Sequence, residues 1–210
     1  TVSISATDYI GHTFGPNSIE IEDTYLRLDK DIADFLLYLD TTVGKGNYLF
    51  FLSADHGVAH VPAFTKEHKI PGGSVSDDAI TIKLNKVIAE KFGIEKAIIA
   101  VMNYQIYLSD SVILQKAAIS EIIIEALKKE DFIADAVVLQ HVALASIPEP
   151  QKVRMINGYS PGRSGDIQFI FKPGYFDGGT KGTTHGLWNP YDAHIPLLFF
   201  GWNIKPGKTY

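Results

Sequence analysis

The chain has 210 residues, of which 46% are hydrophobic and 20% charged, and its mean hydropathy is +0.05. This length and composition predict one soluble globular domain or a large part of one. The hydrophobic content excludes intrinsic disorder. With 19 basic and 24 acidic residues the formal net charge is −5, so we expect no binding to nucleic acid polymers or to a membrane. The absence of cysteine excludes disulfides and thiolate metal sites, which leaves oxygen and imidazole groups as possible metal ligands.

The first quarter of the chain predicts a strand, a helix and a second strand. Residues 2–6 are β-branched or small and predict a short strand, and a polar loop is expected over residues 8–17. From residue 18 to about residue 42, apolar residues recur at spacings of three and four, which predicts an amphipathic helix capped by Ser18 and ended by Gly44. The apolar run at residues 48–52 predicts a strand covered on both faces. This order indicates a parallel crossover.

The rest of the chain predicts further strands and helices after a long loop at residues 57–78. Helices are expected at residues 77–92, 111–130 and 151–157, and strands at residues 97–101, 105–108, 136–139, 166–172 and 195–200, the first two joined as a hairpin at residues 103–104. The predicted fold class is α/β, with a mostly parallel sheet and helices on both faces. A small α+β insertion is expected at residues 75–140.

Two short motifs place a carboxylate beside an imidazole where a predicted strand ends. They are Asp8-x-x-x-His12 and Asp55-His56-Gly57, and a third imidazole, His185, lies in a Gly-rich turn. Open α/β sheets bind ligands beyond the carboxyl ends of their strands. Carboxylate and neutral imidazole groups suit zinc and related divalent ions. The five side chains therefore predict a metal site.

Other polar residues have simpler interpretations. His60, His68 and His141 lack a carboxylate at ligand spacing, and we expect them to be structural or exposed. Asp192 could orient His185 or could serve in packing, and His194 is open to the same two interpretations. Ser53 lacks the Gly-x-Ser-x-Gly elbow of serine hydrolases.

Several motifs together resemble the alkaline phosphatase superfamily. They are TDYIGH at residues 7–12, SADHG at residues 53–57, RSGDI at residues 163–167, THG at residues 184–186 and YDAHIPL at residues 191–197. The likeness is strongest to the branch of the type I phosphodiesterase/nucleotide pyrophosphatases and the related bacterial periplasmic alkaline phosphatases. It runs over nearly the whole chain and implies part of an alkaline-phosphatase-like sandwich.

The resemblance implies a site for two divalent ions, with zinc as the expected metal. Asp8, His12 and His185 would hold one ion, and Asp55 and His56 would belong to the other. The remaining ligands in the family, an Asp and the nucleophilic Thr or Ser, lie upstream of these motifs and have no counterpart in this chain. We therefore expect residues 1–210 to be the C-terminal part of the catalytic domain, with no catalytic nucleophile and negligible activity alone.

The resemblance also implies a phosphate ester as substrate and a periplasmic or extracellular location. A phosphomonoester is slightly favoured, because the late motifs are most like those of the periplasmic phosphatases. A phosphodiesterase, a nucleotide pyrophosphatase or a sulfatase of the same superfamily is the alternative. A non-catalytic metal-binding or interaction domain is a second alternative, and a plain α/β domain without stoichiometric zinc is a third. The sequence leaves the oligomeric state open.

Overall fold

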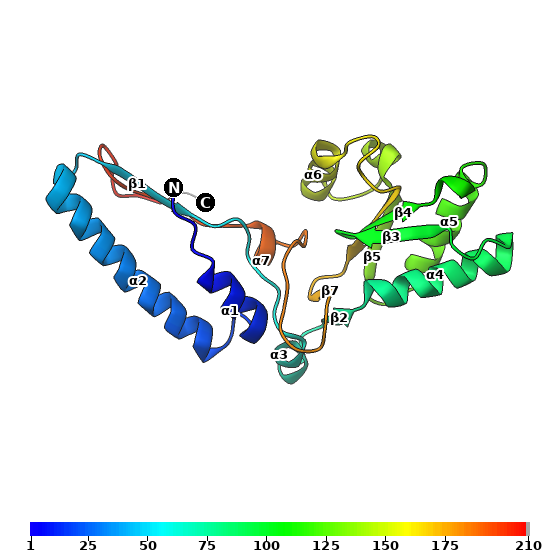
Figure 1. Cartoon of the computed structure of the whole chain (residues 1–210), viewed down its shortest axis with the longest axis horizontal. Helices are drawn as coiled ribbons and strands as arrows, with labels where there is room; N and C mark the ends of the chain where they lie inside the picture. Colours follow the sequence, from blue (N-terminus) through cyan, green and yellow to red (C-terminus); the bar gives the residue numbers. More distant parts are fainter. Residues whose placement is uncertain (209–210) are drawn as a thin grey trace. The chain divides into compact units, whose positions relative to one another are not determined.

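The computed structural model describes residues 1–208, and the chain divides into two compact units (Figure 1). Unit 1 comprises residues 1–64 and the chain from residue 181 onward, and unit 2 comprises residues 65–180. A short helix, α3 (Pro62–Glu67), lies at the boundary. In residues 1–208 no helix is both long enough and apolar enough to cross a membrane.

Unit 1 is built from two helices and a two-stranded antiparallel sheet. Its elements are α1 (Ala6–Phe14), α2 (Ile19–Leu39), a π-helical turn (Asp40–Gly44), β1 (Leu49–Ser53), α7 (Pro190–Ala193) and β8 (Leu197–Gly201). The Ser18 hydroxyl accepts a hydrogen bond from the backbone N–H of Ile21, which confirms the predicted cap of α2. The pairing of β1 and β8 runs from Leu49 opposite Gly201 to Ser53 opposite Leu197.

The secondary structure predicted for residues 2–17 is wrong. Residues 2–6 form no strand; the chain is irregular up to Ser5, and α1 occupies most of the predicted loop at residues 8–17. A strand needs a partner edge, and among the described residues β1 is paired with β8 alone. The parallel crossover expected from residues 2–52 is therefore absent from the described part of the chain.

Unit 2 contains a four-stranded antiparallel sheet in the order β3-β4-β6-β5. Its strands and longer helices are β2 (Gly73–Val75), α4 (Asp77–Phe92), β3 (Ile98–Met102), β4 (Gln105–Leu108), α5 (Lys116–Leu127), β5 (Ile133–Val138), α6 (Glu149–Gly158), β6 (Ile167–Phe171) and β7 (Tyr175–Asp177). Helices α4 and α5 pack against each other and against the sheet (Figure 1). The fully buried core includes Ile88, Ile123 and Phe169.

The α/β class is confirmed, while the expected parallel sheet is only partly present. Among the described strands, β2 and β7 form a parallel pair, and the other pairs are antiparallel. The hairpin prediction is confirmed: Asn103 and Tyr104 have φ of 51° and 62°, as a two-residue turn with both central residues left-handed requires. That residues 75–140 are an insertion stays a prediction, although unit 2 contains this range.

Asp77 is the first residue of α4, and its carboxyl group is poorly solvated. Its buried Oδ1 has no hydrogen-bond partner, while its backbone N–H donates to Asp177 Oδ1 at 3.0 Å. Burial, followed by the charges of Asp177 and Asp78, raises the pKa of Asp77 from 3.8 to about 6. The folded state thus binds this proton more tightly than the unfolded chain does, so stability is lost as the pH rises through about 4 to 6.

We predict that Asp77→Asn stabilises the chain at neutral pH by about 1 kcal/mol, a value reduced for the partial solvation of the side chain. At pH 4 the wild-type carboxyl is already protonated in the folded state, so the difference should nearly vanish. Urea unfolding followed by circular dichroism at pH 7.5 and pH 4 measures both values. Glu90→Gln, at an exposed carboxylate of α4 that does not contribute to the shift, is the matched control. Equal stabilisation at both pH values would contradict the prediction.

Candidate metal centre

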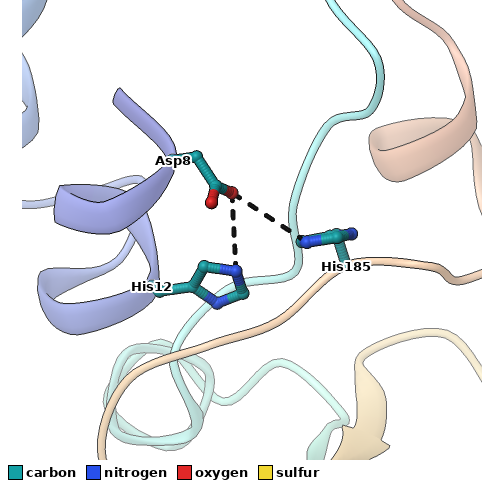
Figure 2. A group of neighbouring side chains, drawn as sticks. All are labelled: Asp8, His12 and His185. Atoms are coloured by element: carbon teal, nitrogen blue, oxygen red, sulfur yellow. Dashed lines mark ion pairs between the residues drawn. The ribbon is translucent and has the colours of Figure 1, made fainter. Parts of the chain in front are cut away.

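Helix α1 places Asp8 and His12 on one face, because residues four apart lie one turn above each other. Asp8 Oδ1 lies 3.4 Å from His12 Nε2 (Figure 2). The other ring nitrogen, His12 Nδ1, lies 2.8 Å from the backbone oxygen of Thr183. A carbonyl oxygen only accepts, so Nδ1 carries a proton, and in the neutral ring the Nε2 lone pair faces Asp8.

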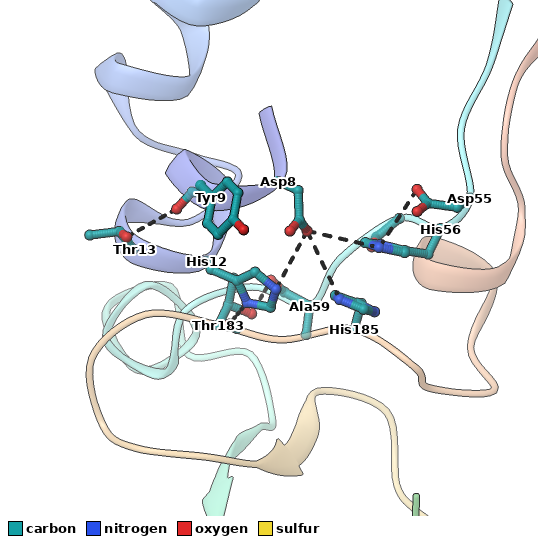
Figure 3. Close-up of polar contacts among 10 residues, drawn as sticks. Asp8, Tyr9, His12, Thr13, Asp55, His56, Ala59, Thr183 and His185 are labelled. Carbon is teal, nitrogen blue, oxygen red and sulfur yellow. Dashed lines mark hydrogen bonds and ion pairs between the residues drawn. The ribbon is translucent and has the colours of Figure 1, made fainter. Parts of the chain in front are cut away.

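The segment after β1 brings His56 to the same carboxylate. His56 Nε2 lies 3.8 Å from Asp8 Oδ1 and 3.6 Å from Asp55 Oδ1. His56 Nδ1 lies 2.8 Å from the backbone oxygen of Gly57, so Nδ1 of this ring carries a proton and Nε2 is the nitrogen that faces Asp8. The Asp55 side chain is 89% exposed, and its ion pair with His56 is its contact with the side chains around Asp8 (Figure 3).

His185, in the loop before α7, is the third imidazole that lies beside Asp8. Its Nε2 lies 3.9 Å from Asp8 Oδ1, and its ring stacks on His56 with centroids 3.4 Å apart and planes 9° apart. Burial lowers the pKa of His185, and the nearby His56 and His12 lower it further. The neutral imidazole, which is the form that binds metals, is therefore favoured.

The imidazole nitrogens around Asp8 lie beyond hydrogen-bond distance and leave room for a cation. The three Asp8–imidazole distances of 3.4, 3.8 and 3.9 Å exceed the range of a good N–H···O bond. Two ligand atoms on one tetrahedral zinc ion, each at about 2.0–2.1 Å, are separated by about 3.3 Å. Asp8, His12 and His185 offer ligand atoms that all lie within 4.8 Å of one another. One carboxylate and two imidazoles are a donor set that suits this metal.

Hydrogen bonds join α1 to the loop that carries His185 and join that loop to the segment that follows His56. The Thr183 N–H donates to the His12 oxygen at 3.0 Å, and the Thr183 hydroxyl donates to the Ala59 oxygen at 2.6 Å (Figure 3). The Ala59 N–H donates to the Thr184 oxygen at 3.2 Å. Gly182 has φ of +78°, and a Cβ there would lie 2.4 Å from the His12 oxygen, so only glycine allows this approach.

Asp192 fastens both imidazole loops to α7. Its side chain is buried, and its Oδ2 accepts the N–H of Leu187 at 2.6 Å, two residues after His185. Its backbone oxygen accepts the N–H of Gly57 at 2.6 Å, one residue after His56. Sequence reasoning left Asp192 between orientation and packing, and these bonds favour a supporting role. His194, by contrast, is exposed.

The five predicted ligands all lie in unit 1 and gather around Asp8. His68 and His141 lie in unit 2, and His60 binds Asn17 at 2.7 Å and stacks on Phe64, in agreement with their predicted structural or exposed roles. A cleft of about 390 Å³ borders Asp8, His12, Asp55 and His56, and Glu22 and Tyr25 of α2 line it too. These α2 residues were missed, because helical periodicity does not indicate which side of a helix faces a cleft.

The chain belongs to the type I phosphodiesterase/nucleotide pyrophosphatase family, whose sequence profile matches residues 1–193. Alkaline phosphatase PafA of Elizabethkingia meningoseptica is 50% identical over 214 residues, covering 100% of this chain and 39% of the relative. Alkaline phosphatase PhoV of Synechococcus elongatus is 48% identical, with 99% and 38% covered. A Myroides odoratus protein named calcium-transporting ATPase is 51% identical, with 99% and 39% covered.

A crystal structure of wild-type alkaline phosphatase PafA has the same fold over this chain. It superposes with a TM-score of 0.90 at 50% identity, covering 97% of this chain and 40% of that one. The expected alkaline-phosphatase-like fold and the resemblance behind it are thereby confirmed. The chain spans about two fifths of the length of the relatives it matches.

We predict that Gly57→Ala weakens zinc binding about tenfold or more, the range seen when groups supporting a ligand are disturbed. A Cβ at residue 57 would lie 2.1 Å from the Tyr191 oxygen and would displace the segment that carries His56. Competition with a chromophoric chelator measures the affinity. Gly207→Ala, whose new Cβ meets nothing within 4 Å, is the control. Unchanged affinity in Gly57→Ala would show that this close approach does not position His56.

We predict that Asp192→Ala lowers zinc affinity about 10- to 100-fold, whereas Asp192→Asn keeps most of it, because an amide oxygen still accepts the Leu187 N–H. The same chelator competition measures both variants, and circular dichroism verifies that each is folded. If the two variants lose affinity equally, the side-chain acceptor is not what matters at this position.

Proposed function

We propose that this chain forms the metal-binding part of a phosphate ester hydrolase of the alkaline phosphatase superfamily. The observation that carries the proposal is the convergence of His12, His56 and His185 on one oxygen of Asp8. Membership of the phosphodiesterase family and the similarity to PafA and PhoV, both named alkaline phosphatases, support the reaction class.

In this proposal two divalent ions, with zinc as the expected metal, bind around Asp8. Asp8, His12 and His185 hold one ion, while Asp55 and His56 supply part of the second site. When bound, such ions act as Lewis acids that stabilise negative charge on the oxygens of a phosphate ester. The chain's own residues hold the ligands in place: the Thr183 and Gly57 oxygens fix the protonated nitrogens of His12 and His56.

The nucleophile of this reaction lies outside residues 1–210, and no residue of the chain is proposed for that role. Ser53 is an unsuitable candidate, since its hydroxyl donates to the Pro196 oxygen at 2.9 Å. We therefore propose that the chain alone turns over phosphate esters negligibly. A periplasmic or extracellular location belongs to the same proposal and is supported by the resemblance of the late motifs.

Phosphomonoesters are the proposed substrates, and phosphodiesters are the second candidate. The names of PafA and PhoV favour the monoester, whereas the description of the matched family names phosphodiesterase and pyrophosphatase. The groups that would contact the two ester substituents are not among the five proposed ligands. Comparing aryl phosphates with bis-aryl phosphates on a complete family chain carrying these residues distinguishes the candidates.

We predict that the purified chain binds zinc stoichiometrically and that Asp8→Ala lowers the affinity about 100-fold or more, because all three imidazoles lose their common carboxylate. Elemental analysis after dialysis and chelator competition provide the measurements. Asp23→Ala, which removes an exposed α2 carboxylate paired with Arg27 at 2.7 Å, is the matched control. A wild-type chain without stoichiometric zinc would contradict the metal centre. Robust aryl phosphate turnover abolished by Asp55→Ala would contradict the proposed inactivity of the isolated chain.

A further inference from the structure

Unit 2 contains a cavity of its own, in addition to the cleft at the metal centre in unit 1. The cavity has a volume of about 210 Å³ and lies where helices α4 and α5 pack against each other (Figure 1). Seven of its nine lining residues are apolar, and the other two, Lys83 and Glu130, are charged. Binding sites for small molecules have this composition, with a mostly apolar lining and a few polar groups. We call this cavity the unit 2 pocket.

The inner part of the unit 2 pocket is formed by the hydrophobic core. Ile80 and Leu84 of α4 and Leu127 of α5 line the pocket and are buried. Ala79 on α4 and Ala126 on α5 line it too, and their small side chains leave space that larger residues would fill. Protein interiors are otherwise closely packed, and an apolar cavity binds apolar molecules more readily than water.

One wall of the unit 2 pocket is an aromatic ring held in place by its neighbours. The ring of Phe132, which lines the pocket, lies 6.0 Å from the ring of Phe171 and 6.3 Å from that of Tyr175. The backbone oxygen of Phe132 accepts the N–H of Lys172 at 2.8 Å, which joins this residue to the end of β6. A fixed aromatic side chain favours a second ring beside it, edge to face or offset.

The two charged lining residues form an ion pair at the opening of the unit 2 pocket. Lys83 Nζ, from α4, is paired with Glu130 Oε1, from the segment after α5. The Lys83 side chain is 60% exposed, so its ammonium group lies toward solvent. The ammonium group has further N–H groups to donate, and the carboxylate has further lone pairs to accept.

This ion pair favours an uncharged hydroxyl group on a ligand. A hydroxyl group accepts from the Lys83 ammonium and donates to the Glu130 carboxylate, and the ion pair stays intact. A carboxylate on the ligand would lie beside the negative charge of Glu130, and an ammonium group would lie beside the positive charge of Lys83. The volume limits the rest of the molecule: an apolar cavity of about 150 Å³ binds benzene, so about 210 Å³ accommodates one ring with small substituents.

We propose that the unit 2 pocket binds an uncharged, single-ring molecule that bears one hydroxyl group. The ring lies between α4 and α5 beside Phe132, and the hydroxyl group lies at the Lys83–Glu130 pair. This inference does not depend on the proposed hydrolase reaction, because the five proposed metal ligands all lie in unit 1 and the pocket lies in unit 2.

The test titrates the 210-residue chain with 4-methylphenol and follows the backbone amide signals by NMR. We expect saturable shifts at Ala79, Ala126 and Phe132, with a Kd of about 1 mM or below, a value attainable for so small a molecule. Toluene, 4-methylbenzoate and 4-methylbenzylamine should each bind at least fivefold more weakly. Saturable shifts confined to unit 1, or no saturation up to about 10 mM, would overturn the proposal. Equal affinity for 4-methylbenzoate would also overturn it.

Substitutions that fill the unit 2 pocket test its role directly. Ala79→Phe and Ala126→Phe should each weaken 4-methylphenol binding at least tenfold, because the new ring occupies the space of the ligand. Ala118→Phe, at an exposed alanine of α5 that does not line the pocket, is the matched control. Circular dichroism verifies that the variants are folded. If neither filling variant weakens binding, the proposal is overturned.

A substitution at the ion pair tests how the ligand is selected. Lys83→Met keeps much of the side chain's apolar length and removes the ammonium group, so the affinity for 4-methylphenol should fall to near that for toluene. An unchanged preference for 4-methylphenol over toluene in Lys83→Met would overturn the proposed ligand class. A chain that binds 4-methylphenol in unit 2 but holds no zinc supports the pocket and contradicts only the metal centre.

Discussion

The geometry of unit 1 depends on one carboxylate shared by three imidazoles. Asp8 Oδ1 is approached by His12 from its own helix, by His56 from the end of a strand and by His185 from a loop more than 170 residues away. In their neutral forms His12 and His56 turn an Nε2 lone pair toward this negatively charged oxygen, which is unfavourable without a cation. Backbone oxygens accept from Nδ1 of His12 and His56, so Nε2 is the nitrogen that each of these rings turns toward the carboxylate. Such an arrangement gains its stability when a positive charge lies between the groups.

Features set by local physical chemistry were predictable from the sequence. Residues 77–92 form a helix with the predicted limits, because Ser76 caps its start and Gly93 adopts the left-handed conformation after its end. The turn at Asn103 and Tyr104 was predictable from the two apolar runs that flank it. The assignment of the five ligands stays a prediction, although the sequence alone was enough to select them as carboxylate–imidazole motifs.

Features that depend on distant partners were not predictable. Residues 2–6 have strand-like composition, but composition does not supply the neighbouring edge that a strand needs. The apolar run at residues 48–52 correctly predicted a strand, β1, but the expected cover on both faces is wrong in the described residues, since Leu49 and Phe51 are exposed. Nothing local indicated an antiparallel partner at β8, nearly 150 residues later. The bonds of Thr183 and Ala59 were similarly inaccessible, because the partners of a hydroxyl or a backbone group lie far away along the chain, and for Asp192 the sequence left orientation and packing both open.

The bonds between Ala59 and residues 183–184 join the chain where it leaves unit 1 to the chain where it returns. Residues 60–182 therefore form a closed loop whose two ends are held together by these hydrogen bonds, which we call the stem. The entropic cost of closing a loop rises only slowly with its length. A change in the length of this loop therefore changes the free energy of forming the stem only slightly. The bonds of Ala59 to residues 183–184 thus hold the His56 and His185 loops in register whatever the length of chain between them.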